Sequence, residues 1–314
     1  MKKNWLRVFF INILTVTAIL VIVELVCRVV LSKIYNRKFD HQLVVKKKYG
    51  PRTDGMKPLY TTTVWGKSFS TDSLGWRKVK TNNRGKKKWL FIGDSVAEGV
   101  GVGDSSTFAS ICSEKFDEYN IENCSLIGYS TYDYLHVLDS LVQNDSSIEL
   151  VTIFYCLNDV YGPHHTDDLP VMAQRTILGK LNGLLQDRYA TYKLIKLWFY
   201  KNSNRYFTYD LGFYSAEELT FKSSMNYIKH CRDICRSREI YFNVVMLPYR
   251  SQLKDKNFVP QQLVKSFCEK DSIDFSDASE YLLKQPDYNS LYLFADEIHF
   301  SEKGHRAIAE FLSE

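Results

Sequence analysis

From residue 89 to the end of the chain, short apolar runs alternate with longer segments of helical pattern. Compact runs of this kind are typical of strands in a sheet that helices cover on both faces. The runs lie at residues 89–92, 121–126, 150–156, 240–247 and 273–275. The helical patterns lie at residues 107–116, 132–142, 215–236 and 302–312. This alternation predicts a three-layer α/β/α domain around a mostly parallel five-stranded sheet.

Residues 160–214 interrupt the alternation with a segment rich in leucine and aromatic residues. We expect a helical insertion over one edge of the sheet. Such apolar stripes usually serve ordinary packing, but an insertion beside a cleft can also act as a lid that excludes water. Helix starts are marked elsewhere by capping residues. Ser215 and Glu218 have the spacing of a capping box, and Ser301 precedes the last helical pattern.

A continuous apolar segment at residues 8–31 follows a basic flank at residues 2–7. Its length matches the about 20 residues that a membrane-spanning helix needs. A cleaved signal peptide is the alternative, but no small-x-small cleavage motif follows the apolar run. We therefore expect one uncleaved N-terminal transmembrane helix. Glu24 and Arg28 stand one helical turn apart near its end, where they can pair or reach the interface.

The net charge is distributed unevenly along the chain. The first 52 residues hold 11 of the 41 Lys and Arg residues and 2 of the 36 Asp and Glu residues, which gives them +9 and leaves −4 for the remainder. A mildly acidic body argues against a nucleic-acid binder, whose basic residues should cover a face of the folded domain. Basic residues flank the apolar segment on both sides, and the positive-inside rule applied alone favours a cytoplasmic body.

Neither the cysteines nor the histidines indicate a metal site. The seven cysteines are odd in number, form no CxxC pair and mostly lie in apolar segments, so we expect buried free thiols. His164 and His165 stand beside two Asp residues, but such a cluster is usually a solvated loop. We therefore expect no metal and no cofactor.

The sequence LFIGDSVAEGVGVG at residues 90–103 places Gly93-Asp94-Ser95 and a glycine-rich stretch directly after a predicted strand. A phosphate-binding loop would need the spacing GxxxxGK[ST], and a dinucleotide site would need GxGxxG. Neither spacing is present, so the phosphate interpretation is weak. The competing interpretation is an exposed nucleophile at the carboxyl end of a strand, where an open α/β sheet places its site.

A serine nucleophile needs a base, and the base needs a group that fixes its tautomer. Asp296 and His299 lie three positions apart just before the last helical pattern, and both can turn toward the same end of the sheet. The reaction also needs donors for an oxyanion. Gly128 and Asn158 follow the second and third predicted strands. Glycine lets a backbone N–H approach closely, and asparagine supplies a side-chain amide.

The order of these blocks resembles that of the SGNH hydrolases, also called the GDSL esterase/lipase superfamily. The four blocks are residues 93–95, 123–128, 156–159 and 296–299. The resemblance extends over about residues 70–314 and implies a flavodoxin-like SGNH fold. One departure is Cys156, because the family usually has glycine at that position. This difference concerns the local backbone more than the triad.

The resemblance implies a role for each matching residue. Ser95 would be the nucleophile, His299 the general base, and Asp296 the residue that orients His299. The backbone N–H groups of Ser95 and Gly128 and the side chain of Asn158 would form the oxyanion hole.

Three residues near these blocks have simpler interpretations. We expect Asp94 and Asp159 to be hydrogen-bond acceptors that stabilise turns. We expect His305, inside the last helical pattern, to be a surface or packing residue.

We therefore predict a membrane-anchored SGNH-type esterase. Residues 1–31 would form the anchor and residues 86–314 the hydrolase domain. Residues 32–85 would form a juxtamembrane segment and a hairpin around a turn at residues 73–75. The partners would be the membrane and a small-molecule or glycan ester.

Two other functions remain open for the same chain. The triad could transfer the acyl group to a sugar hydroxyl, as an O-acetyltransferase of cell-surface polysaccharide does. The chain could also be a non-catalytic, membrane-tethered binding module. Anchored members of the family often act on envelope carbohydrates, so the resemblance places the body outside the cytoplasm, against the charge count.

Overall fold

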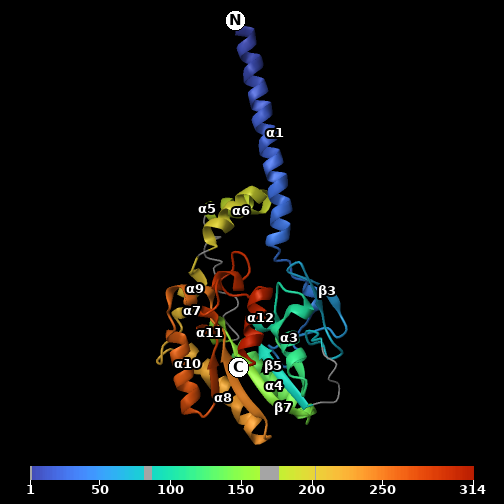
Figure 1. The fold of residues 1–314 in the computed structure, drawn as a ribbon, viewed down its shortest axis with the longest axis vertical. Helices are drawn as coiled ribbons and strands as arrows, with labels where there is room; N and C mark the ends of the chain where they lie inside the picture. The colour runs from blue at the N-terminus through green and yellow to red at the C-terminus, as the bar shows by residue number, and fades with distance from the viewer. Residues whose placement is uncertain (1, 81–86, 163–176, 202) are drawn as a thin grey trace. The chain divides into compact units, whose positions relative to one another are not determined.

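The computed structural model describes residues 2–80, 87–162, 177–201 and 203–314. The chain divides into two compact units, whose elements are labelled in Figure 1. One unit consists of residues 1–36 and 168–201, and the other of residues 37–167 and 202–314. The predicted loop with His164 and His165 lies outside the described residues.

The larger unit is built on a five-stranded sheet with the strand order β6-β5-β7-β8-β9, in which all neighbours are parallel. In chain order this is 2-1-3-4-5, the order of flavodoxin-like folds. The predicted α/β/α fold is therefore confirmed, and the sheet is entirely parallel. Its strands are β5 Lys87–Gly93, β6 Tyr119–Asn123, β7 Ile148–Tyr155, β8 Tyr241–Met246 and β9 Asp274–Asp277.

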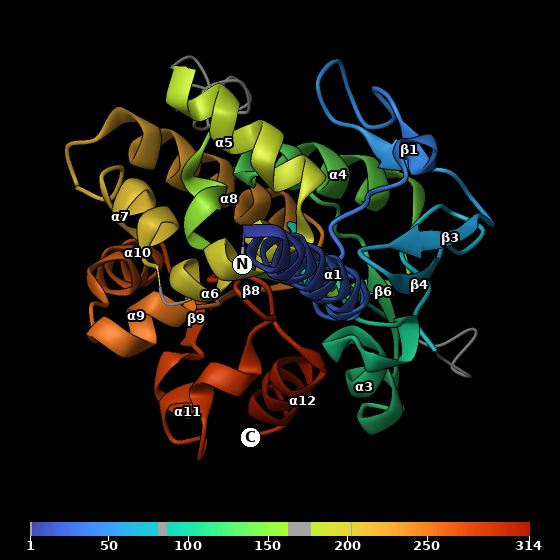
Figure 2. The ribbon, with the colours of Figure 1, turned by 90° about the horizontal axis from the view of Figure 1, so that it is seen from above.

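Helices cover both faces of this sheet (Figure 2). α4 Thr131–Asn144 packs against α8 Leu219–Ser237, and α3 Phe108–Lys115 packs against α12 Glu302–Phe311. The right-handed crossovers from β5 to β6 and from β6 to β7 run in opposite directions along the sheet, which puts α3 and α4 on opposite faces. The other α-helices described in this unit are α2 Ser95–Glu98, α7 Arg205–Leu211, α9 Arg250–Asp255, α10 Val259–Lys270 and α11 Ser279–Leu283.

Capping residues explain where two of these helices begin. The helix predicted from residue 215 starts only at Leu219, because Ser215 Oγ accepts the backbone N–H of Glu218 at 3.1 Å and forms a turn before the helix. Glu218 is the N-cap of α8. Ser301 caps α12 as predicted, since its Oγ accepts the backbone N–H of Gly304 at 3.3 Å.

Aromatic side chains fill the space between the sheet and the helices. The rings of Phe91 on β5 and Phe154 on β7 lie 4.8 Å apart, and Phe108 of α3 packs on Phe154 at 4.6 Å. At the end of β5 the chain must turn sharply against this core. A Cβ at Gly93 would lie 2.5 Å from Ala97 Cβ and 3.0 Å from the carbonyl oxygen of Phe154, so only glycine fits there without movement.

A small hairpin precedes the sheet. β3 Thr61–Val64 pairs antiparallel with β4 Lys67–Ser70 around Trp65 and Gly66, whose φ angles are 50° and 75°. Positive φ at both central residues is the type I′ turn that suits paired strands. A second chain reversal follows at residues 73–75, where a hairpin turn was expected. Thr71 bridges antiparallel to Arg77 around it, and the backbone N–H of Asp72 donates to the carbonyl oxygen of Trp76 at 2.9 Å. The Asp72 carboxylate accepts two backbone N–H groups within this turn.

Shorter elements complete the larger unit. β1 Val44–Val45 pairs with β2 Gly55–Met56. The 3₁₀ turns described in this unit are η1 His41–Leu43, η2 Asp104–Ser106, η3 Leu157–Val160 and η6 Tyr288–Leu291.

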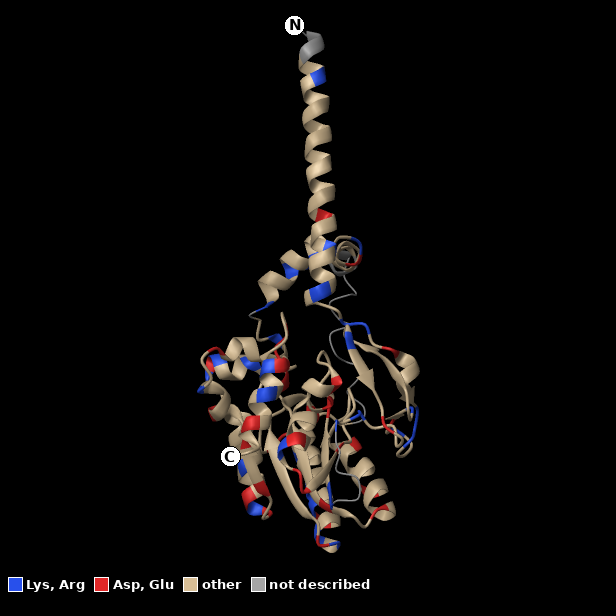
Figure 3. Cartoon of the chain, turned by 45° about the vertical axis from the view of Figure 1, so that its right-hand side comes forward, with Lys and Arg blue, Asp and Glu red and all other residues tan. Residues whose placement is uncertain are grey.

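The smaller unit is helical, with α1 Lys2–Ile34, α5 Ile177–Arg188 and α6 Ala190–Tyr200. The stretch Trp5–Ile34 of α1 is long and apolar enough to cross a membrane, with a mean hydropathy of 2.5. No Lys, Arg, Asp or Glu lies between Arg7 and Glu24. Figure 3 shows this part of the helix without charged residues.

Candidate active site

Ser95 is the first residue of α2, directly beyond the carboxyl end of β5. Asp94 precedes it as the N-cap of this short helix, and its Oδ1 accepts the backbone N–H of Val96 at 2.8 Å. The predicted role of Asp94 as a turn acceptor is thus confirmed. Its other oxygen, Oδ2, lies 3.4 Å from Ser95 Oγ. The strand end and the cap together fix the position of the serine hydroxyl.

Ser95 and His299 meet although 204 positions separate them in the sequence. Ser95 Oγ lies 2.9 Å from His299 Nε2, and His299 Nδ1 lies 3.0 Å from Asp296 Oδ2. Asp296 Oδ1 accepts the backbone N–H groups of Ile298 and His299 at 2.7 and 2.9 Å. The structure therefore brings hydroxyl, imidazole and carboxylate together in the order that a serine nucleophile, its base and an orienting acid require.

Asp296 also has a second charged partner. Arg37 Nη2 lies 2.6 Å from Asp296 Oδ2, the same oxygen that faces His299. Burial alone would raise the pKa of Asp296, but the charge and hydrogen bonds of His299 together with Arg37 hold that pKa well below its usual range. The carboxylate is therefore ionised throughout the neutral pH range.

Trp65 lies between Arg37 and His299. The Arg37 guanidinium carbon is 3.9 Å from the centroid of the Trp65 ring, and the Trp65 and His299 rings meet edge-on at 4.7 Å. The type I′ turn places this side chain at the tip of its hairpin. Neither Arg37 nor Trp65 was predicted from the sequence as a site residue. The Trp-Gly turn was an available signal, whereas Arg37 had been attributed to the basic flank of the membrane segment.

Asn158 lies in η3, the turn that follows β7. Its Nδ2 donates to Asp94 Oδ2 at 2.8 Å, beside Ser95. A carboxamide nitrogen carries two hydrogens, so one N–H remains for another acceptor. Gly128 follows β6 with a φ of 86°, and a Cβ there would meet nothing within 4 Å. Within the described residues, no acceptor engages the backbone N–H of Gly128 or of Ser95.

Tyr249 holds Asn158 from the other side. Tyr249 Oη lies 2.9 Å from Asn158 Oδ1 and 2.7 Å from Asp210 Oδ2. Burial raises the pKa of Asp210 to about 6, against hydrogen bonds from Tyr161 and Tyr249 that lower it. One hydroxyl proton cannot serve two acceptors, so the protonation state of Asp210 decides where Tyr249 donates. No motif in the sequence indicated Tyr249 or Asp210.

The glycine-rich stretch after the serine wraps around a buried arginine. Arg77 Nη1 donates to the carbonyl oxygens of Glu98 and Gly99 at 2.7 and 2.5 Å, and its Nη2 donates to that of Val102 at 2.7 Å. Gly99 and Gly101 both have a φ of 83°, which residues with a side chain rarely adopt. A phosphate cradle presents backbone N–H groups. Here the carbonyl groups point inward, so the glycines serve the fold of this loop.

Two further predictions concern residues around the site. Asp159 Oδ2 accepts the backbone N–H of Cys156 at 2.6 Å, which confirms Asp159 as a turn acceptor. Cys156 has a φ of −108°, a conformation open to any residue, so the turn does not need the family's glycine. His305 is a packing residue: its Nδ1 accepts the backbone N–H of Phe108 at 3.2 Å, and burial lowers its pKa to about 3.

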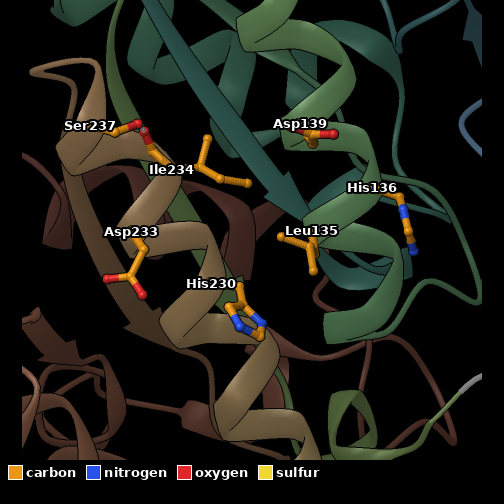
Figure 4. A pocket seen from close by; sticks show the side chains of 7 residues that line it. All are labelled: Leu135, His136, Asp139, His230, Asp233, Ile234 and Ser237. Atoms are coloured by element: carbon orange, nitrogen blue, oxygen red, sulfur yellow. Dashed lines mark hydrogen bonds between the residues drawn. The ribbon is translucent and has the colours of Figure 1, made fainter.

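A pocket between α4 and α8 shares no residue with this site (Figure 4). It is lined by Leu135, His136, Asp139, His230, Asp233, Ile234 and Ser237. Its two His and two Asp residues do not come together as a group that could hold a metal ion. Across the part of the chain that the structure describes, no three His, Cys, Asp or Glu residues could hold a metal ion.

The fold and the site together define a flavodoxin-like α/β protein with Ser, His and Asp side chains aligned at the carboxyl edge of its sheet. Residues 91–307 match the model of the GDSL-like Lipase/Acylhydrolase family. This match covers more than half of the chain, so the chain belongs to that family. It is therefore an esterase of the SGNH type.

Several solved structures are similar in fold. The crystal structure of TesA has 11% identity and a TM-score of 0.45, and the match covers 72% of this chain and 96% of that one. The acetyl xylan esterase AlAXEase has 13% identity and a TM-score of 0.45, covering 72% and 98%. A lipase/acylhydrolase from Enterococcus faecalis has 13% identity and a TM-score of 0.43, covering 72% and 93%. Among curated proteins, none matches this sequence.

Proposed function

We propose that this esterase cleaves a carboxylic ester through an acyl-enzyme with Ser95 as the nucleophile. The observation that carries the proposal is the distance of 2.9 Å from Ser95 Oγ to His299 Nε2, with Asp296 on the other ring nitrogen. His299 takes the hydroxyl proton while Oγ bonds to the carbonyl carbon, and it returns that proton to the leaving alcohol. Water activated by His299 then releases the acid and restores Ser95.

The carbonyl oxygen becomes negatively charged in both steps and needs donors beside Ser95. We assign the backbone N–H groups of Ser95 and Gly128 and the remaining N–H of Asn158 to this role. The free N–H groups in the first two residues support the assignment. Asn158 is held by Asp94 and Tyr249, and a donor that is fixed in advance costs little reorganisation during the reaction.

We further propose that α1 is a retained membrane anchor. The catalytic unit would then lie outside the cytoplasm. Its substrate would be an O-acyl group of a carbohydrate or lipid. The 33 residues of α1 span about 50 Å, more than the about 30 Å of a bilayer's hydrocarbon core. Labelling of intact cells with a membrane-impermeant fluorophosphonate tests the orientation. Labelling that requires cell lysis would contradict it.

The reaction is tested by comparing Ser95→Ala with Ser125→Ala on p-nitrophenyl acetate and on acetylated glycans. Ser125 is a matched control, because it is also a buried serine after a strand of the same sheet and its Oγ contacts only a backbone carbonyl. We expect the Ser95 variant to lose hydrolysis and the control to keep it. Wild-type activity in Ser95→Ala would overturn the mechanism, and acylated glycan instead of free acid as the product would replace hydrolysis by acyl transfer.

A further inference from the structure

In the unit that contains α1, helices α5 and α6 form a hairpin whose turn contacts α1 (Figure 1). Glu24 of α1 accepts the backbone N–H groups of Ala190 and Thr191 at 2.8 and 3.0 Å, and the Thr191 hydroxyl at 2.8 Å. Arg28 donates to Glu24 at 2.9 Å and to the carbonyl oxygen of Arg188 at 2.7 Å. This pair therefore binds both the N–H groups that start α6 and the carbonyl that ends α5.

α6 relies on this contact for its cap. Its N-cap residue is Tyr189, and no side chain of the helix itself caps its first turn. Unpaired N–H groups at a helix start can be hydrated in water, but they are costly near the hydrocarbon region of a membrane. A carboxylate at this end also interacts favourably with the helix dipole. The two charged residues near the end of an apolar helix are thus explained as the binding site for a second helix.

The hairpin places polar groups inside and apolar groups outside. The Tyr192 hydroxyl and the Lys196 ammonium of α6 donate to Asn182 Oδ1 of α5 at 2.7 and 3.2 Å. On α6, Trp198 and Phe199 are 60% and 71% exposed. A helix at the surface of a globular protein buries its apolar stripe. The reverse arrangement is what contact with lipid requires.

The exposed apolar surface continues over both helices of the hairpin. Its members are Leu181, Leu184, Tyr189, Ile195, Trp198, Phe199 and Tyr200. Trp and Tyr with neighbouring Lys, here Lys193 and Lys201, are the composition found at the membrane–water boundary. Glu24 and Arg28 follow the uncharged stretch of α1 at residues 8–23, so the hairpin joins α1 where this uncharged stretch ends.

We propose that the α5–α6 hairpin is a second membrane-contacting element, which lies in the bilayer interface and is held on the anchor by Glu24 and Arg28. The surface that covers it is lipid, because the hairpin is bonded to α1 at Glu24 and Arg28, and α1 and the hairpin both expose apolar side chains. The proposal rests on the anchoring role proposed above for α1. It is independent of the reaction at Ser95.

Photo-crosslinking tests the lipid contact. The full chain is reconstituted into vesicles of phosphatidylcholine and phosphatidylglycerol with a diazirine on one acyl chain, and the crosslinked residues are located by peptide mass spectrometry. Leu219 is the control, because it is apolar and 78% exposed in the larger unit. We expect crosslinks on α1, Trp198 and Phe199 and none on Leu219. If α1 is crosslinked but α6 is crosslinked no more than Leu219, the proposal is overturned. A protein surface rather than lipid would then cover the hairpin.

The same sample tests the anchor, the hairpin and the esterase mechanism separately. If α1 is not crosslinked, both the anchor proposal and the hairpin proposal are wrong. Fluorophosphonate labelling of Ser95 reports separately on the esterase mechanism, so its loss leaves the crosslinking result intact.

Glu24→Leu tests the attachment of the hairpin to α1. We expect the yield of crosslinks on α6 to fall about tenfold, while the yield on α1 stays the same. The reason is that losing one helix cap shifts the equilibrium between attached and detached hairpin by about this factor. Thr15→Val is the matched control, because Thr15 is a polar residue of α1 whose hydroxyl bonds only to Ile11 of the same helix. Unchanged crosslinking of α6 in Glu24→Leu would show that Glu24 does not hold the hairpin.

Discussion

Arg37 Nη2 lies 2.6 Å from Asp296 Oδ2, closer than His299 Nδ1, which lies 3.0 Å from the same oxygen. Arg37 and the Trp65 ring on which it packs both precede residue 91, where the family match begins. Asp296 is therefore paired with an arginine, and His299 with a tryptophan, from outside the matched residues.

Replacing Arg37 by glutamine should destabilise the protein in a pH-dependent way. Arg37 is one of the groups that lower the pKa of Asp296, so the variant has a higher pKa there. A carboxylate with a lowered pKa stabilises the fold above its unfolded pKa of about 4, and this stabilisation disappears as the pH falls through the folded value. We expect a loss of about 2 kcal/mol at pH 7 that persists at pH 3 and shrinks only in stronger acid, as the pH falls through the lowered folded pKa; urea unfolding in detergent measures it.

The control for this prediction is Arg306→Gln, which removes the same charge from an exposed position on α12. This variant should unfold like the wild type over the whole pH range. A loss in Arg37→Gln that stays the same from pH 7 down to pH 1 would show that its effect does not pass through the Asp296 carboxylate.

Asn158→Ala should slow catalysis strongly without unfolding the protein. Removing one oxyanion donor costs about 3 kcal/mol of transition-state stabilisation, or roughly a hundredfold to a thousandfold in kcat. The substitution also frees Asp94 Oδ2 and the Tyr249 hydroxyl, so its thermal unfolding is measured beside its kinetics. A folded variant with more than a tenth of the wild-type kcat would exclude Asn158 from the oxyanion hole.

Tyr249→Phe should lower kcat by a smaller factor, about tenfold. Its hydroxyl contacts Asn158 but lies behind it, so it acts by positioning the amide, and a lost hydrogen bond is worth about 1 kcal/mol. The effect should vanish in the Asn158→Ala background, because the two residues act through one group. Tyr292→Phe is the control: this buried tyrosine donates to the carbonyl of Pro248 and should keep its kcat. Additive losses in the double variant would separate Tyr249 from Asn158.

Asp210→Asn should change how stability depends on pH. Burial raises the pKa of Asp210 to about 6, so the folded state favours the neutral carboxyl. Its contribution to stability is fully present below the unfolded pKa of about 4 and is lost as the pH rises through about 6. Urea unfolding at several pH values measures this. Relative to the wild type, the free energy of unfolding of the variant should rise between pH 4 and pH 7 by at most about 3 kcal/mol. A constant difference would contradict the raised pKa.

The sequence was sufficient to predict the parallel sheet, whose strands repeat along the chain, and the candidate site residues that follow a fixed order. The buried runs at β5, β7 and β8 contain enough consecutive apolar residues to identify a covered parallel sheet. Ser95, Asp296 and His299 were found because their blocks keep the order of a known family. These residues meet in space only because strand ends gather at one edge of the sheet.

The partners that orient these residues could not be predicted, because no sequence spacing links them. Tyr249 reaches Asn158 from the end of β8, and Asp210 of α7 reaches Tyr249, so both contacts depend on tertiary packing. Glu24 and Arg28 were expected to pair with each other, and they do so. Their contacts with the end of α5 and the start of α6 join segments 160 or more positions apart. Sequence patterns indicate only local periodicity, so contacts between distant segments cannot be predicted from them.

Covalent labelling with a fluorophosphonate tests the central claim, that the Ser95 hydroxyl is activated by His299. Peptide mass spectrometry locates the adduct in the wild type and in His299→Gln, and residual ester hydrolysis is followed in the same samples. The account predicts one adduct on Ser95 that forms in proportion to the loss of activity, and at least a hundredfold slower labelling without the imidazole, on the order of the effect of a general base. Inactivation with the adduct on another residue, or labelling of Ser95 in His299→Gln at the wild-type rate, would contradict it.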